Sequence, residues 1–313
     1  MINNDLKTQI INALDAWMEN HPKLTQNDIA SNANVNPAYL VHMRKRDFGI
    51  KSGDKTTAIA DKYFLRIANY INFKIGTSYW ETKPTIQLKE VLTCLSIART
   101  QLDTTVLIGE TGSGKTYSLQ TFENKFPGEV FTIKVGASDN LKDLISKVLE
   151  VLKVSPLKTT ASAGIGQIAV KLKTLKEQGQ YPILVFDEAE YMKHQALCAF
   201  KELYDILHHE CALALIGTNE LIININKLVK RNHPGIAQLF RRIKFKIHHL
   251  PPIDKRFEQF IMDVPPELRK WLQYNCENYG ELHDVLVPAL EEADRSNIPL
   301  SLDLVKTILG TEI

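Results

Sequence analysis

The stretch that decides the fold is Gly109-Glu110-Thr111-Gly112-Ser113-Gly114-Lys115-Thr116, which has the spacing G-x-x-x-x-G-K-T. It lies between the apolar run 105–108 and a helix-compatible segment, 117–124. Glycines let such a loop curl so that successive backbone N–H groups face one phosphate, and the following helix adds its positive end. We therefore predict a nucleotide-binding P-loop, with Lys115 on the β- and γ-phosphates and the Thr116 hydroxyl on Mg²⁺.

The second half of the predicted nucleotide site consists of polar residues at the ends of two further apolar runs. The run 183–186 ends in Asp187 and Glu188. We expect Asp187 to hold the Mg²⁺ shell, and Glu188 to orient and deprotonate the attacking water. The run 213–217 ends in Thr218 and Asn219, which we expect to hydrogen-bond the γ-phosphate or its water. An ordinary turn at Thr218 and Asn219 is the alternative.

The segments around these motifs alternate between strand and helix patterns. We predict strands at 105–109, 130–135, 182–187, 213–217 and 243–247, and helices at 86–100, 117–124, 141–154, 168–178 and 194–208. Continuous apolar strands between helices indicate a parallel sheet covered on both faces. After residue 252 only helical patterns remain, near 253–263, 265–278, 281–294 and 301–309. The expected fold is therefore an α/β nucleotide-binding domain over 85–250, with a helical lid over 251–313.

A small all-α domain is expected over 1–76, joined by a linker at 77–84. Within 26–43, Ala30 suits a helix crossing and Asn34 suits a left-handed turn, while Val35, Leu40 and Met43 supply the apolar contacts of a second helix. The pattern resembles a phage-repressor-like helix-turn-helix, and segment 56–75 is predicted to be the helix that closes the domain. Trp80, in the linker, is expected to pack close to the adenine or to act as a plain hydrophobic anchor.

The second helix of this pattern offers a polar side to a DNA major groove and its phosphates. The candidate contacts are Asn36, Tyr39, His42, Arg44, Lys45 and Arg46. The alternative is a small three-helix domain that contacts other proteins, because helix-turn-helix patterns are short and degenerate.

Composition sets broader limits. The chain has 313 residues, 44% hydrophobic and 24% charged, and a formal net charge of +2, so a nucleic-acid surface must come from local patches. Four scattered cysteines argue against a zinc site or a disulfide framework. No targeting segment or run of membrane-spanning length is evident, which predicts a cytoplasmic protein without a membrane partner.

One local patch lies between residues 221 and 253. This segment has seven basic residues and no acidic one: Lys227, Lys230, Arg231, Arg241, Arg242, Lys244 and Lys246. Arg241 and Arg242 follow a helix-compatible segment and precede the last predicted strand, where an arginine finger for a neighbouring subunit's nucleotide would lie. A solvated basic face is the alternative.

Taken together, the motifs resemble AAA+ ATPases, and within that class the Mu-phage transposition protein B family. The resemblance rests on segments that occur in the family's order: Glu81-Thr82-Lys83-Pro84-Thr85, the P-loop, Asp187-Glu188-Ala189-Glu190, Gly217-Thr218-Asn219 and Leu239-Phe240-Arg241-Arg242-Ile243. By position in the last segment, Arg242 is the first choice for the finger and Arg241 the second. His283 departs from the pattern, because related ATPases often have a sensor arginine there.

The resemblance implies an ATP- and Mg²⁺-dependent protein that oligomerises on duplex DNA as a helical filament or ring. It would recruit and stimulate a transposase of the integrase type, release DNA after hydrolysis, and be encoded by a bacterium, phage or mobile element. Two alternatives stay open: a helicase-loader-type ATPase, and a helix-turn-helix regulator whose ATPase sets its oligomeric state. Lys158, Lys171 and Lys173 are candidate phosphate contacts in a DNA channel, or else part of a solvated helix face.

Overall fold

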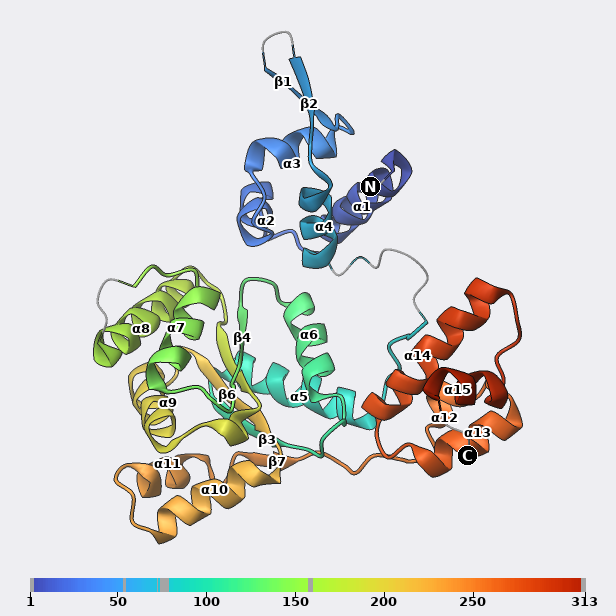
Figure 1. Cartoon of the computed structure of the whole chain (residues 1–313). Coiled ribbons are helices and arrows are strands. Elements are labelled where there is room, and N and C mark those ends of the chain that lie inside the picture. Colours follow the sequence, from blue (N-terminus) through green and yellow to red (C-terminus); the bar gives the residue numbers. More distant parts are fainter. Residues whose placement is uncertain (1–2, 53–54, 72, 74–78, 157–159, 311–313) are drawn as a thin grey trace. The chain divides into compact units, whose positions relative to one another are not determined.

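The computed structural model describes residues 3–52, 55–71, 73, 79–156 and 160–310. Figure 1 traces the chain. The chain divides into two compact units, Met1–Ser78 and Tyr79–Ile313, and each is described by itself.

The first unit contains a helix-turn-helix with a short hairpin after it. Its elements are α1 (Asn4–Glu19), α2 (Gln26–Asn32), α3 (Pro37–Arg44), β1 (Gly49–Ser52), β2 (Lys55–Ala58) and α4 (Asp61–Tyr70). Asn34 has φ 54°, which confirms the predicted left-handed turn. Ala30, Leu40 and Met43 are fully buried, as the pattern requires. The small core of this unit therefore forms where the helix-turn-helix pattern places it.

This unit is not entirely helical, which corrects the all-α prediction. β1 and β2 pair antiparallel, with Gly49 opposite Ala58. The predicted helix over 56–75 begins only at Asp61, because residues 55–58 are extended. β-branched residues such as Thr57 favour extended backbone, and the weak helical periodicity of this segment hid that preference.

The second unit is built on a parallel five-stranded sheet, as predicted. Its strands are β3 (Thr104–Ile108), β4 (Val130–Lys134), β5 (Ile183–Asp187), β6 (Ala212–Gly217) and β7 (Ile247–His249), in the order β4-β5-β6-β3-β7. The last strand lies later than the predicted 243–247. Ile243 instead ends a helix, where it is fully buried together with Ile236 and Leu239. Their spacing of three and four residues is helical, and this period decides the local structure.

Helices cover both faces of the sheet. They are α5 (Ile86–Gln101), α6 (Lys115–Lys125), α7 (Leu141–Val151), α8 (Ala161–Glu177), α9 (His194–Leu207), α10 (Asn219–Lys230) and α11 (Ile236–Ile243), with a 3-10 turn η1 (Ala189–Tyr191). In one hydrophobic cluster, Leu184 and Phe186 pack together with residues of helices α7 to α11. In a second cluster, Ile183 and Val185 pack together with residues of α5 and α6. Alternate residues of one strand thus face two cores.

Two helices differ from the sequence prediction. The helix predicted at 168–178 begins earlier, at Ala161, because Thr160 caps α8 by accepting a hydrogen bond from the backbone N–H of Ala163 at 3.3 Å. Helix α10 was not predicted. It follows β6 directly and buries Leu221 and Ile225. Both helices complete the layer over the first of the two cores.

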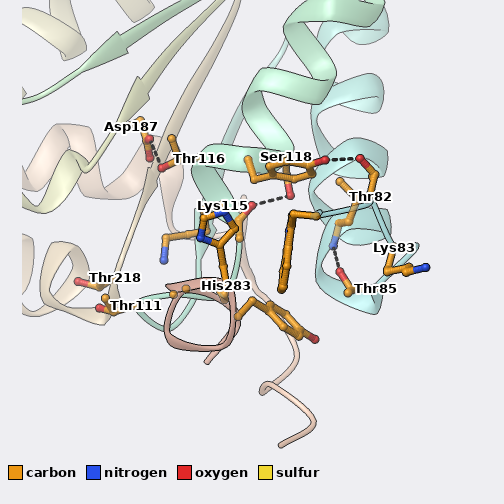
Figure 2. A pocket seen from close by; sticks show the side chains of 18 of the residues that line it. Thr82, Lys83, Thr85, Thr111, Lys115, Thr116, Ser118, Asp187, Thr218 and His283 are labelled. Atoms are coloured by element: carbon orange, nitrogen blue, oxygen red, sulfur yellow. Dashed lines mark hydrogen bonds between the residues drawn. The ribbon is translucent and has the colours of Figure 1, made fainter. Parts of the chain in front are cut away.

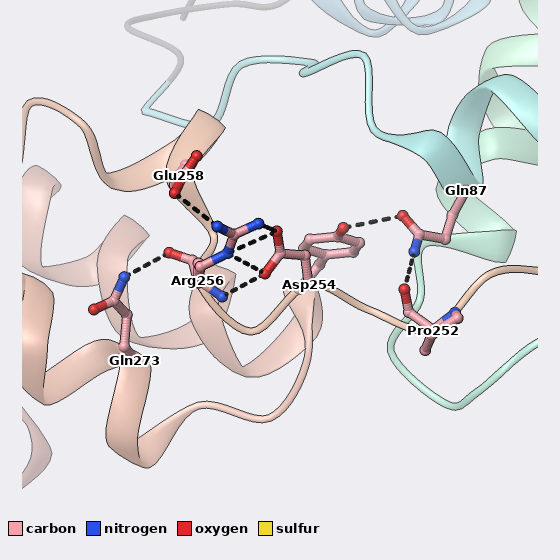
Figure 3. A network of polar contacts seen from close by, with 7 residues as sticks. Gln87, Pro252, Asp254, Arg256, Glu258 and Gln273 are labelled. Carbon is pink, nitrogen blue, oxygen red and sulfur yellow. Dashed lines mark hydrogen bonds and ion pairs between the residues drawn. The ribbon is translucent and has the colours of Figure 1, made fainter.

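The lid has its own core, and hydrogen bonds connect it to the sheet domain. Its helices are α12 (Glu258–Ile261), α13 (Pro266–Asn275), α14 (Tyr279–Ser296) and α15 (Leu302–Leu309). The buried Gln87 of α5 donates a 2.8 Å hydrogen bond to the carbonyl of Pro252 (Figure 3). It also donates one to the carbonyl of Pro251, at 3.1 Å, and accepts one from Tyr279, at 3.0 Å. Gln87 therefore fixes the start of the lid to the sheet domain. No helix of the described residues is both long and apolar enough to cross a membrane.

Candidate nucleotide-binding site

The P-loop joins the end of β3 to the start of α6, as its sequence requires. Gly112 and Gly114 have φ values of +72° and +82°, which favour glycine. The Nζ atom of Lys115 donates hydrogen bonds to the carbonyls of Gly109 and Glu110, at 2.9 and 2.6 Å. Burial lowers the pKa of Lys115, while nearby carboxylates act in the opposite direction. The lysine is therefore positioned by the loop itself.

Two observations describe the surroundings of the loop. The hydroxyl of Ser113 is buried and has no hydrogen-bond partner among the described residues, although Ser113 lines the cavity. A Cβ atom on Gly112 would lie 2.2 Å from Oδ1 of Asn278, which precedes α14. The lid thus approaches the loop closely, and only glycine fits at this position.

Thr116 and Asp187 meet at the carboxyl edge of the sheet. The Thr116 hydroxyl donates a 2.7 Å hydrogen bond to Oδ2 of Asp187, which is only 2% exposed. Burial raises the pKa of Asp187, and the hydrogen bond from Thr116 opposes that rise. A hydroxyl and a carboxylate are oxygen ligands that suit Mg²⁺, which usually takes its other ligands from water and phosphate. The pair therefore has the donor set of a Mg²⁺ site, and an ion there would neutralise phosphate charge.

Glu188 is held by a residue that sequence reasoning missed. Its carboxylate forms an ion pair with Nζ of Lys134, at 3.0 Å, and its backbone has φ 55°. Lys134 ends β4 and pairs in register with Asp187 of β5. Only the order of the strands brings this lysine beside the predicted catalytic carboxylate, so the linear sequence gave no signal for it.

We expect Lys134→Ala to raise the rate of ATP hydrolysis by about threefold to fivefold. The Lys134 side chain is 68% exposed and that of Glu188 is 34% exposed, so loss of the ion pair has a modest effect and frees the Glu188 carboxylate to orient water. Phosphate release under single-turnover conditions measures this. Lys142→Ala, at an exposed position on α7, is the matched control. A slower rate in Lys134→Ala would mean that the lysine helps Glu188 rather than restraining it.

Glu190 is a second residue whose place was not foreseen. Its Oε2 atom accepts a 3.3 Å hydrogen bond from the backbone N–H of Thr218. A Cβ atom on Gly217 would lie 2.4 Å from the same oxygen, so a larger residue there would displace the Glu190 carboxylate. Glu190 thereby joins the turn after β5 to the end of β6, where Thr218 lines the cavity.

The cavity itself has a volume of about 390 Å³ and an aromatic wall. Trp80 stacks on Phe260 with ring centres 4.7 Å apart, and His283 meets Trp80 edge-on at 5.1 Å. Tyr279 completes this wall. Figure 2 shows Lys115, Thr116, Asp187 and His283 around the cavity. The P-loop and an aromatic surface thus line one cavity.

We expect Trp80→Ala to weaken ATP binding about tenfold, because one aromatic face for the base is lost. Titration of the protein with a fluorescent ATP analogue measures the dissociation constant. Inorganic tripolyphosphate provides the control: it has no base, so its competition for the site should be unchanged. An equal loss of affinity for tripolyphosphate would show that Trp80 supports the fold of the site rather than the base.

The other predicted catalytic residues lie outside this cavity. Asn219 begins α10 and lines an adjoining hollow with Gly109 and His249; Thr111 and Thr218 line both this hollow and the cavity. Arg241 and Arg242 are on α11, and Arg242 forms an ion pair with Asp205 at 2.7 Å. Within the described chain, therefore, the cavity contains Thr218 but neither arginine.

Most of the residues of the first unit that were predicted to contact DNA have partners within that unit. Asn36 caps α3, Tyr39 packs edge-on against Tyr63, and His42 pairs with Asp47. Arg44 and Arg46 both pair with Asp15, at 2.8 and 2.9 Å, and Lys45 is exposed. The two arginines thus attach α3 to α1, and their charge is partly neutralised. In the second unit, Lys171 and Lys173 lie half-buried on α8, and Lys158 lies outside the described residues.

Comparisons with known proteins found one family model and several solved structures that are similar to this chain. Residues 100–222 match a family model described as an AAA domain. A comparison with curated proteins gave no match. Among solved structures, Cdc6p from Pyrobaculum aerophilum is similar in fold, with a TM-score of 0.50 and 17% identity over 74% of this chain and 67% of that chain. The replication initiator DnaA bound to AMPPCP and single-stranded DNA gives a TM-score of 0.42 and 16% identity, over 73% and 67%.

The fold and the site define the class of the second unit. A P-loop followed by a buried strand that ends in Asp187 and Glu188, a parallel five-stranded sheet and a helical lid are the parts of an AAA+ domain. The AAA-domain match over residues 100–222 and the fold of the second unit thus support the AAA+ part of the resemblance drawn from the sequence.

Proposed function

We propose that this protein binds ATP with Mg²⁺ and hydrolyses it to ADP and phosphate. The observation that carries the proposal is the Thr116–Asp187 hydrogen bond beside Lys115, in a cavity with an aromatic wall. Lys115 would contact the β- and γ-phosphates, and Thr116 and Asp187 would hold Mg²⁺. Glu188 would accept a proton from the attacking water as a general base. Thr218 would hydrogen-bond the γ-phosphate or that water.

We further propose that ATP binding controls assembly of the protein on duplex DNA. The support is the helix-turn-helix geometry of the first unit and the resemblance to transposition proteins of the Mu-phage B type. In this proposal ATP-bound subunits form a filament or ring on DNA of any sequence and recruit a transposase of the integrase type. Hydrolysis then releases the DNA, so the reaction acts as a switch.

Electron microscopy of the protein with non-specific duplex DNA tests the second proposal. Samples with ATP, a slowly hydrolysed analogue and ADP are compared, and we expect DNA to be coated only with the triphosphates. A footprint on one discrete sequence would favour the operator-binding regulator instead. Preference for single-stranded DNA, with no coating of duplex, would favour the helicase-loader type of ATPase. Fluorescent-nucleotide binding in the same samples tests the ATP site independently.

A further inference from the structure

Gln87 is a buried polar side chain at the boundary between the sheet domain and the lid. It lies in the first turn of α5 and is only 2% exposed. Its amide nitrogen donates hydrogen bonds to two consecutive carbonyls, those of Pro251 and Pro252, at 3.1 and 2.8 Å. Its amide oxygen accepts a 3.0 Å hydrogen bond from the Tyr279 hydroxyl. A buried amide is costly when it loses its partners, so these contacts favour one placement of the lid against α5.

The two prolines are the point at which the chain crosses from the sheet to the lid. The backbone N–H of Leu250 still donates to the carbonyl of Ile108 in β3, at 2.7 Å, whereas Ile253 already packs in the lid core. Proline has no N–H group, so backbone hydrogen bonds can hold this crossing only through its carbonyls. Gln87 supplies a donor to both carbonyls and thereby holds the lid at its connection to the sheet.

Tyr279 links this connection to the nucleotide cavity. It is the first residue of α14, and it lines the cavity together with the P-loop and Trp80. Its ring centre lies 5.4 Å from that of Phe260 and 5.9 Å from that of Phe257, so it belongs to the aromatic cluster of the lid. One side chain thus bonds to Gln87 through its hydroxyl and forms part of the cavity wall.

The residue before Tyr279 approaches the P-loop separately. Oδ1 of Asn278 would lie 2.2 Å from a Cβ atom placed on Gly112. The same oxygen accepts a 3.0 Å hydrogen bond from the backbone N–H of Glu281, so the first turn of α14 itself orients this side chain. The start of α14 therefore approaches the phosphate-binding loop with one residue and forms the aromatic wall with the next, and the second of these is bonded to Gln87.

We infer that Gln87 is a positioning residue for the nucleotide base: through Tyr279 it holds the lid side of the aromatic wall where a base can stack on it. The inference rests on the proposed function, because it concerns the base of a bound nucleotide. Gln87 is not among the described residues that line the cavity, so it acts through Tyr279 and the crossing. The phosphates would bind Lys115 and Thr116 of the sheet domain, and their binding does not depend on Gln87.

Gln87→Leu tests this inference, because leucine is of similar size and has no polar side-chain atom. We expect the dissociation constant of ATP labelled on its ribose to rise about tenfold, and the affinity of competing inorganic tripolyphosphate, which has no base, to stay unchanged. In steady-state phosphate release, KM should rise by a similar factor while kcat stays within about twofold of the wild type.

A double-variant cycle tests whether Tyr279 transmits the effect. Tyr279→Phe keeps the ring and removes only the hydroxyl, so we expect it to weaken ATP binding about threefold. The double variant Gln87→Leu, Tyr279→Phe should bind ATP no more weakly than Gln87→Leu alone, because the hydroxyl has already lost its partner. Additive losses would show that the two side chains affect binding independently, and would reject the link between them.

Gln273→Leu is the matched control. Gln273 also donates an amide hydrogen bond to a backbone carbonyl, that of Arg256 at 2.8 Å, but both residues lie within the lid (Figure 3). This variant should bind ATP like the wild type. Melting temperatures show whether each variant is folded. If Gln87→Leu is unfolded at the assay temperature, Tyr279→Phe decides alone: a loss for ATP but not for tripolyphosphate supports the inference, and wild-type affinity overturns it.

Three further results would overturn the inference. Wild-type ATP affinity in folded Gln87→Leu would show that the base does not depend on Gln87, while leaving the ATP site intact. Equal losses for ATP and tripolyphosphate would mean that Gln87 supports the whole site rather than the base. An equal loss in Gln273→Leu would assign the effect to general weakening of the lid. Absence of ATP binding in the wild type would instead reject the proposed function, and this inference with it.

Discussion

Lys115→Ala is expected to weaken ATP binding about 100-fold, since charged hydrogen bonds to phosphate are among the strongest in proteins. The side chain already rests on the carbonyls of Gly109 and Glu110, so its ammonium group is held at the loop before nucleotide arrives. Because the variant no longer binds ATP, it should also no longer coat duplex DNA. Fluorescent-nucleotide titration and electron microscopy with DNA measure the two effects separately.

Lys125→Ala is the control for this variant, because Lys125 is an exposed lysine at the other end of the same helix. It should bind ATP and coat DNA like the wild type. Normal DNA coating by Lys115→Ala, together with lost ATP binding, would reject the idea that nucleotide controls assembly. Normal ATP binding by Lys115→Ala would reject the assigned role of the loop itself.

Glu188→Gln should bind ATP normally but hydrolyse it about 100- to 1000-fold more slowly, because an amide cannot accept the proton from water as a carboxylate does. The variant should therefore stay on duplex DNA long after the wild type has been released. Phosphate release measures the first effect, and dissociation from labelled DNA measures the second.

Glu202→Gln, at an exposed position on α9, removes the same charge away from the cavity and should leave both rates unchanged. Hydrolysis by Glu188→Gln at the wild-type rate would contradict the assignment of Glu188 as general base. Slow hydrolysis combined with rapid release from DNA would instead show that hydrolysis does not control the release. The two measurements thus test the base and the switch independently.

The sequence by itself determined the parts of the site that are local. The P-loop spacing dictates the positive φ values of Gly112 and Gly114, the lysine at the start of α6 and the hydroxyl next to it. The apolar strand before Asp187 and the turn at Asn34 were predictable for the same reason, because each depends on residues adjacent in the chain. The periodicity also predicted a parallel sheet with a helical lid.

Tertiary structure alone decided which distant residues meet. Lys134 reaches Glu188 only because β4 pairs with β5, and Trp80 meets Phe260 only because the lid folds back over the linker. Arg241 and Arg242 are adjacent in the sequence, and only the position of Asp205 on α9 gives Arg242 its ion pair. Such pairings depend on strand order and helix packing, and neither is written in the spacing of residues along the chain.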